Sequence, residues 1–119
     1  MSTKATGCPI AEPLLLGLDL GTTRTKAVLV GAGGRQVRAV AAPTPFVTGE
    51  GGVEMDVGAL LATARQVVAG LGTDRDRVAA VGIAGMAECG APLDRSGRPL
   101  APVIGWHDGR GQEAIDRLE

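Results

Sequence analysis

Three short segments rich in valine, leucine and alanine follow one another near the start of the chain, at residues 14–20, 26–30 and 36–42. Glycines bound these segments, so we expect three consecutive β-strands joined by tight turns. The first segment is apolar at almost every position, which is typical of a strand in the centre of a sheet. The pattern therefore predicts a three-strand meander.

The next part of the chain predicts a loop, a helix and a fourth strand. Residues 43–52 are rich in proline and glycine, and we expect them to pass over one face of the sheet. Apolar residues recur at helical spacing over residues 57–71, where Asp56 suits the N-cap and glycines end the pattern. Residues 78–84 predict a buried strand beneath this helix. A strand, a helix and a strand in this order imply a parallel addition to the meander through a right-handed crossover.

The last part of the chain is less regular. Residues 91–94 and 100–104 flank the turn at residues 95–98, and we expect a two-stranded hairpin or an extended arm. A final helix is predicted to begin with Asp108 as its cap. No glycine or proline closes this helix before Glu119, so the pattern stops where the sequence stops.

Bulk composition favours one small globular unit, because the 119 residues carry a net charge of −1 and 45% are hydrophobic. Nucleic acid is not expected as a partner, since the chain is not basic and has only Phe46 and Trp106 to stack on bases. No apolar run approaches the roughly 20 residues of a membrane span. Residues 1–13 lack a secretory pattern and are expected to be a disordered tail. Cys8 and Cys89 have no metal-ligand spacing and indicate free thiols in the cytoplasm.

One carboxylate, Asp19, lies near the end of the first apolar segment, where its burial would be costly without a cation or hydrogen bonds. Gly21, Thr22 and Thr23 follow, and such a turn can direct backbone N–H groups and hydroxyls at one anion. We expect Asp19 to hold a hydrated metal ion and the turn to hold a phosphate. The alternative is an ordinary hairpin turn with Lys26 solvated on the second strand.

This segment resembles the first phosphate motif of the actin-like ATPase superfamily, which includes sugar kinases, actin and heat-shock chaperones. The resemblance implies an α/β fold of the ribonuclease H-like type, in which a three-strand antiparallel meander is followed by the strand-helix-strand addition. It implies ATP and Mg²⁺ as cofactors. Asp19 would bind Mg²⁺ through water, and Gly21, Thr22, Thr23 and Lys26 would contact phosphate.

A second group of motifs lies at residues 82–110 and narrows the resemblance. A strand ends in a small-residue turn, and the pair Ala87-Glu88 follows it. An LD-x-x-G-x-PL-x-P segment begins at Leu93, and a W-x-D-x-R element begins at Trp106. In this order and spacing the motifs resemble the FGGY carbohydrate kinases, and the resemblance covers residues 14 to about 119.

The family resemblance implies a sugar or polyol substrate. Trp106 would offer an apolar platform for C–H groups, and Glu88 would accept hydroxyl protons. Glycerol kinase-like members carry an arginine where this chain has Ala87, which favours a bulkier or differently substituted polyol over glycerol. Trp106 has an alternative role as a core aromatic, and Asp108 and Arg110 are expected to be structural, as a helix cap and a salt bridge.

The resemblance implies that the whole enzyme transfers the γ-phosphoryl group of ATP to a substrate hydroxyl. It places the catalytic base aspartate and the adenosine-binding second lobe beyond residue 119. We therefore expect residues 14–119 to be part of an N-terminal lobe, inactive alone and self-associating through surfaces left exposed. Two other classes remain open: a non-catalytic actin-like nucleotide switch, and an iron-sulfur activator ATPase with cysteine ligands from two subunits.

Overall fold

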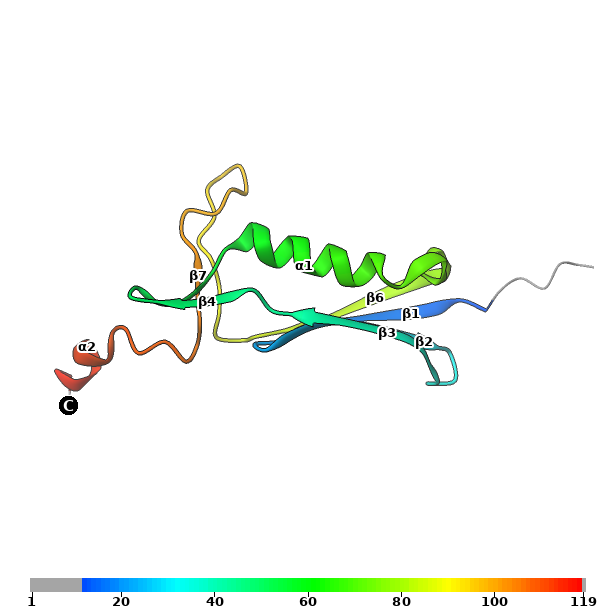
Figure 1. Cartoon of the computed structure of the whole chain (residues 1–119), viewed down its shortest axis with the longest axis horizontal. Coiled ribbons are helices and arrows are strands. Elements are labelled where there is room, and N and C mark those ends of the chain that lie inside the picture. Colours follow the sequence, from blue (N-terminus) through cyan, green and yellow to red (C-terminus); the bar gives the residue numbers. More distant parts are fainter. Residues whose placement is uncertain (1–11, 119) are drawn as a thin grey trace, which may run out of the picture.

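A four-stranded mixed sheet forms the body of the molecule in the computed structural model, which describes residues 12–118 (Figure 1). The strand order is β3-β2-β1-β6, with β1 antiparallel to β2, β2 antiparallel to β3, and β1 parallel to β6. The expected meander and its parallel addition are therefore confirmed. The expected tail at residues 1–13, with Cys8, lies outside the described residues except for Glu12 and Pro13. The strands are β1 (Leu14–Leu20), β2 (Arg24–Gly31), β3 (Gln36–Pro43) and β6 (Val78–Gly85).

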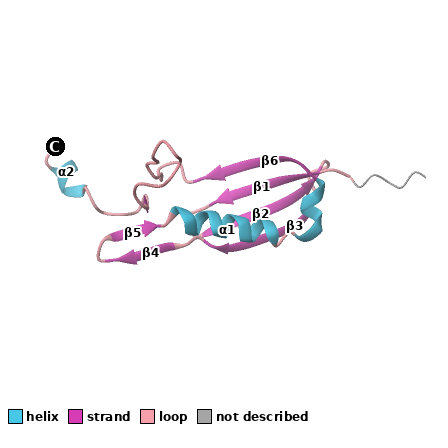
Figure 2. Ribbon diagram, turned by 90° about the horizontal axis from the view of Figure 1, so that it is seen from above, coloured by secondary structure: helices cyan, strands magenta, loops and turns pink. Residues whose placement is uncertain are grey.

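One helix, α1 (Val57–Ala69), covers part of one face of this sheet (Figure 2). Asp56 caps it as expected, because its carboxylate accepts a hydrogen bond from the backbone N–H of Ala59 at 2.8 Å. A short 3₁₀ helix, η1 (Gly72–Arg77), then leads into β6. The main core lies between α1 and the first two strands; its buried members are Leu14, Leu16, Ala27, Leu29, Val67 and Leu71.

The expected burial of the fourth strand is wrong. Strand β6 is the edge of the sheet, and nearly all of its residues are exposed, including Val81 and Ile83. The reason is the position of α1, which packs against β2 and β3 rather than against β6 (Figure 2). Leu15 on β1 is also half exposed on the face opposite α1. The sheet therefore presents apolar side chains that no described residue covers.

The proline- and glycine-rich segment does not form the expected loop over the sheet. It forms a hairpin of β4 (Phe46–Gly49) and β5 (Gly52–Met55), which extends beyond the end of the main sheet (Figure 1). Gly52 permits the tight turn, because its φ of 107° lies in a region that other residues rarely adopt. Strand β7 (Val103–Ile104) pairs with β5 and completes a second, three-stranded sheet.

The segment between β6 and β7 is an extended arm with one isolated bridge, from Leu93 to Pro99, rather than a two-stranded hairpin. The turn itself is confirmed: the Asp94 carboxylate accepts hydrogen bonds from the backbone N–H groups of Ser96 and Arg98, both at 2.8 Å. These N–H groups, with that of Arg98 the stronger influence, lower the pKa of Asp94.

The final helix, α2 (Gln112–Asp116), begins three residues later than expected, because Gly111 rather than Asp108 is at its N-cap position. Asp108 is not its cap, because the Asp108 carboxylate is engaged elsewhere, as described below. None of the helices among residues 12–118 has the length and apolar character needed to span a membrane.

Candidate functional site

The turn between β1 and β2 has a shape that only glycine allows at its first position. A Cβ atom on Gly21 would lie 2.9 Å from the backbone carbonyl oxygen of Arg24, closer than real Cβ contacts occur. The Asp19 carboxylate would lie 3.7 Å from the same point. The sequence Gly-Thr-Thr is therefore matched to a narrow turn that follows directly from a central strand.

Two buried threonines, Thr25 and Thr44, form hydrogen bonds that hold this turn, and the sequence analysis did not predict a role for either of them. The Thr44 hydroxyl donates to the Gly21 carbonyl oxygen at 2.6 Å and lies 3.1 Å from the Thr25 hydroxyl oxygen. Because a hydroxyl has one proton, Thr25 must be the donor in the second bond. The backbone N–H of Thr44 donates to the Thr23 carbonyl oxygen at 3.0 Å. The chain after β3 thus fixes the turn at two points.

Asp19 is not buried as the apolar run predicted, because its side chain is 48% exposed. It lies on the sheet face opposite α1, directly across from Lys26 on β2. The Lys26 ammonium is 3.6 Å from the Asp19 carboxylate, so a cationic group does meet this charge. A half-exposed ion pair contributes little to stability, and both groups stay accessible to a ligand.

The Gly-Thr-Thr turn and the second motif leave the sheet at the same end, where the parallel strands β1 and β6 finish. Strands β1 and β6 are parallel, and their last residues, Leu20 and Gly85, are paired directly. Met86, Ala87 and Glu88 follow immediately after β6. In open α/β sheets, ligands bind beyond the carboxyl ends of parallel strands, which is where these two segments meet.

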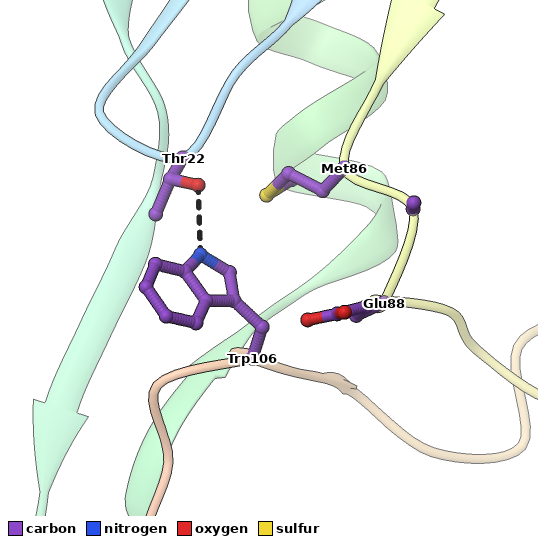
Figure 3. A pocket seen from close by; sticks show the side chains of 5 residues that line it. Thr22, Met86, Glu88 and Trp106 are labelled. Carbon is purple, nitrogen blue, oxygen red and sulfur yellow. Dashed lines mark hydrogen bonds between the residues drawn. The ribbon is translucent and has the colours of Figure 1, made fainter.

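An open pocket of about 310 Å³ lies at this end of the sheet (Figure 3). Thr22, Met86, Ala87, Glu88 and Trp106 line it. The Trp106 side chain is 58% exposed, so the alternative of a core aromatic is wrong. In Figure 3 the indole lies on one side of the pocket, and Met86 and Glu88 lie on the other. The combination of an aromatic face, a carboxylate and a hydroxyl suits a small molecule with both C–H and O–H groups.

Trp106 is held in place by polar and aromatic neighbours. Its indole N–H donates to the Thr22 hydroxyl oxygen at 3.1 Å, across 84 residues of sequence (Figure 3). Its ring meets the His107 ring edge to face, with centroids 5.4 Å apart, and His107 in turn contacts Phe46 at 5.8 Å. Trp106 is therefore positioned by Thr22 in the Gly-Thr-Thr turn and, through His107, by Phe46 in the second sheet.

A charged network ties the W-x-D-x-R element to β5. The Asp108 side chain is 2% exposed and accepts hydrogen bonds from the Arg110 guanidinium and from the backbone N–H of Val53. Arg110 also reaches Glu54 at 2.7 Å. The structural role expected for the Asp108–Arg110 pair is confirmed. The expectation that Asp108 caps the final helix is wrong, because its carboxylate binds the Val53 N–H and the Arg110 guanidinium instead.

Hydrogen bonds from the Arg110 side chain, and then from the backbone N–H groups of Arg110 and Val53, hold the pKa of Asp108 well below its ordinary value. A carboxyl with a lowered pKa stabilises the fold above its unfolded-state pKa of about 3.9, and this stabilisation is lost as the pH falls toward the folded value. We therefore expect Asp108→Asn to be less stable than the original chain at pH 7, with the difference shrinking below about pH 4.

Urea unfolding followed by circular dichroism at pH 7, 5, 4 and 3 would measure this difference. The exposed Asp76→Asn is the matched control, because Asp76 makes only a loose 3.8 Å contact with its neighbour Arg75. A difference for Asp108→Asn that stays constant down to pH 3 would contradict the assigned ion pair.

Comparison with known proteins agrees with this geometry. The model of the N-terminal domain of the FGGY family of carbohydrate kinases matches residues 14–119. The chain belongs to this family. A glycerol kinase of Aromatoleum aromaticum is 40% identical over 111 residues, and an erythritol kinase of Brucella abortus is 26% identical over 110 residues. These matches cover 87% and 88% of this chain, but only 22% and 21% of the relatives.

Solved structures of sugar kinases share the fold. The xylulose kinase of Rhodospirillum rubrum superimposes with a TM-score of 0.78 at 31% identity, over 88% of this chain and 22% of that one. The Brucella ovis structure described as a xyloylose kinase gives a TM-score of 0.79 at 26% identity, over 88% and 23%. The chain thus spans about a fifth of the length of the kinases it matches. Membership in this family favours a kinase over the switch and iron-sulfur alternatives.

The FGGY site residues expected from the sequence fall into two groups in the structure. Thr22, Ala87, Glu88 and Trp106 share the pocket, whereas Asp19 and Lys26 face the open surface of the sheet. Among the described residues, no group of three or more histidine, cysteine, aspartate or glutamate side chains converges. Met86 was missed as a pocket residue, although its place directly before Ala87-Glu88 was a usable signal.

Proposed function

We propose that this chain forms part of an ATP-dependent carbohydrate kinase, which transfers the γ-phosphoryl group of ATP to a hydroxyl of a sugar or polyol. One observation carries the proposal: the Gly-Thr-Thr turn and the pocket of Glu88 and Trp106 lie at one end of the sheet and are joined by the Thr22–Trp106 hydrogen bond. Phosphoryl transfer depends chiefly on bringing donor and acceptor together and on stabilising charge. The Gly-Thr-Thr turn and the pocket lie at the same end of the sheet, which would bring the phosphoryl donor close to the acceptor hydroxyl.

The residues at the turn fit a magnesium nucleotide. Asp19 offers an accessible carboxylate for a water ligand of Mg²⁺, and Lys26 places a positive charge beside it. Backbone N–H groups and hydroxyls of Gly21, Thr22 and Thr23 would contact phosphate oxygens. Bound Mg²⁺ would supply neutralisation of the phosphate charge, and the Gly-Thr-Thr turn would orient the phosphoryl group toward the pocket that Thr22 lines.

The pocket favours a small polyol or an open-chain sugar. Glu88 would accept hydrogen bonds from substrate hydroxyls, and the exposed face of Trp106 would pack on C–H groups. Ala87 fills little of the pocket, so we expect substrates larger than glycerol to be accommodated. The names of the relatives, glycerol kinase and erythritol kinase, support a polyol.

Residues 14–119 would then be part of the N-terminal lobe of a cytoplasmic enzyme, and the FGGY resemblance assigns the catalytic base to a later residue. We expect no phosphoryl transfer by these 119 residues alone. Apolar residues are exposed on both faces of the sheet, with Leu15 on the face opposite α1 and Val81 and Ile83 on the part of the other face that α1 leaves uncovered, and they support the further expectation of self-association in this isolated state.

Titration of the single tryptophan tests the proposal. We expect glycerol, erythritol, xylitol or xylulose to change the emission of Trp106, and Glu88→Gln to weaken binding about tenfold, because a hydrogen bond to a charged group contributes about 1.5 kcal/mol. Glu113→Gln on α2 is the matched control, since Glu113 makes only an exposed 3.7 Å contact with Arg117.

Two results would count against the proposal. One is an emission that none of these polyols changes, and the other is equal weakening by Glu88→Gln and Glu113→Gln. Release of ADP from MgATP that depends on added polyol would instead show that the 119 residues are catalytically sufficient, which contradicts the assignment of the base to a later residue.

A further inference from the structure

Thr22 occupies two sites at once. It lies in the turn between β1 and β2, beside the proposed phosphate position, and its side chain also lines the pocket with Trp106 (Figure 3). Nothing in the order of the sequence links these residues, which are 84 positions apart. The hydrogen bond between them is therefore a product of the fold.

The direction of this hydrogen bond is fixed by its chemistry. The indole Nε1 is only a donor, so the Thr22 oxygen is the acceptor at 3.1 Å. The Thr22 hydroxyl then keeps its own proton for another acceptor, and the structure gives it none within residues 12–118. That proton is available to an oxygen atom of a molecule bound in the pocket.

Trp106 needs such a support. It follows β7, which has only two residues, and its side chain is 58% exposed. Its contact with His107 is an edge-to-face contact between the two rings and involves no hydrogen bond. The indole N–H is the only polar group of the Trp106 side chain, so its hydrogen bond to Thr22 is the contact that defines how the ring is rotated. An aromatic platform binds C–H groups well only if its face is held toward them.

We propose that Thr22 is a positioning residue for substrate binding: its hydroxyl holds the indole face of Trp106 toward the pocket and thereby couples the polyol site to the phosphate turn. This inference rests on the proposed function and extends it to a residue whose expected role was phosphate contact alone. A valine at position 22 has the shape of threonine but cannot accept the indole hydrogen bond, whereas a serine can.

The chain contains one tryptophan, so a ¹⁵N-labelled sample gives one indole N–H resonance. We expect Thr22→Val to shift this resonance and to speed its exchange with water, and Thr22→Ser to restore the original behaviour. With glycerol and erythritol as probes, Thr22→Val should weaken binding about three- to tenfold, and Thr22→Ser should weaken it little. Thr48→Val, an exposed position on β4, controls for the substitution itself.

The remaining backbone resonances report whether each variant is folded. If Thr22→Val does not fold, Thr22→Ser still tests the inference, which requires the indole resonance and the polyol affinity of Thr22→Ser to match those of the original chain. An unchanged indole resonance in folded Thr22→Val would overturn the inference, as would a shifted resonance with unchanged polyol affinity. If the original chain binds no polyol, the proposed function fails. In that case the coupling to the polyol site is overturned with it, whereas the resonance still shows whether Thr22 holds the indole.

Discussion

Leu29→Ala is expected to lower the free energy of unfolding by about 3 kcal/mol, the largest effect of any single substitution considered. Leu29 is fully buried in β2 and packs in the cluster that includes Leu14, Leu16 and Val67. Truncation to alanine removes buried methyl groups and leaves a cavity, and both terms destabilise the fold. A small domain has only about 5–15 kcal/mol of stability, so this loss would be a large fraction of the total.

Urea unfolding followed by circular dichroism would measure this loss. Leu61→Ala makes the same chemical change on α1, where the side chain is 50% exposed, and it should cost about 0.5 kcal/mol or less. Equal losses for the two variants would mean that α1 does not cover Leu29 in solution.

The sequence predicted the main sheet because its signals are local. Short segments rich in valine, leucine and alanine, bounded by glycine at the turns, predicted β1, β2 and β3, and their expected ends differ from the observed ones by at most two residues. Asp56 and the glycines after residue 69 defined the helix in the same way. These elements depend on neighbours in the sequence, which is why local reasoning was sufficient.

Burial was harder to predict, because it depends on where other elements pack. The sequence of β6 has the composition of a covered strand, yet α1 lies over β2 and β3 and leaves β6 exposed. Asp19 likewise lies in an apolar sequence but on the open face of the sheet. Composition indicates how apolar a strand is, and it does not indicate which of its faces is covered.

The contacts that organise the site link distant parts of the chain, and no local rule predicts them. Asp108 was expected to cap a helix, but its carboxylate binds the Val53 N–H, 55 residues earlier. The Trp106 indole N–H likewise donates to a residue far away in the sequence, Thr22, which lies 84 residues earlier. The motifs predicted Thr22, Ala87, Glu88 and Trp106 as site residues, whereas only the structure shows that these residues line one pocket and that Thr22 and Trp106 are joined by a hydrogen bond.

Thr44→Val is expected to destabilise the fold by about 2 kcal/mol and to loosen the Gly-Thr-Thr turn between β1 and β2. The substitution preserves shape but leaves the Gly21 carbonyl oxygen and the Thr25 hydroxyl without their partner. Thr25 is fully buried and Thr44 is nearly so, and a buried polar group without a hydrogen bond costs about 1–3 kcal/mol. The loosening should also appear as a shift of the Trp106 indole resonance, because Thr22 lies in the same turn.

A double-mutant cycle separates this hydrogen-bond chain from simple packing. In Thr25→Val with Thr44→Val, only the Gly21 carbonyl oxygen remains unpaired, so the double variant should lose about 1 kcal/mol less than the sum of the two single losses. Thr48→Val, at an exposed position on β4, is the control and should change the free energy of unfolding little. Additive losses for Thr25→Val and Thr44→Val would show that the two hydroxyls act independently. The turn would then be held by the backbone contact between Thr44 and Thr23 rather than by a chain of buried hydroxyls.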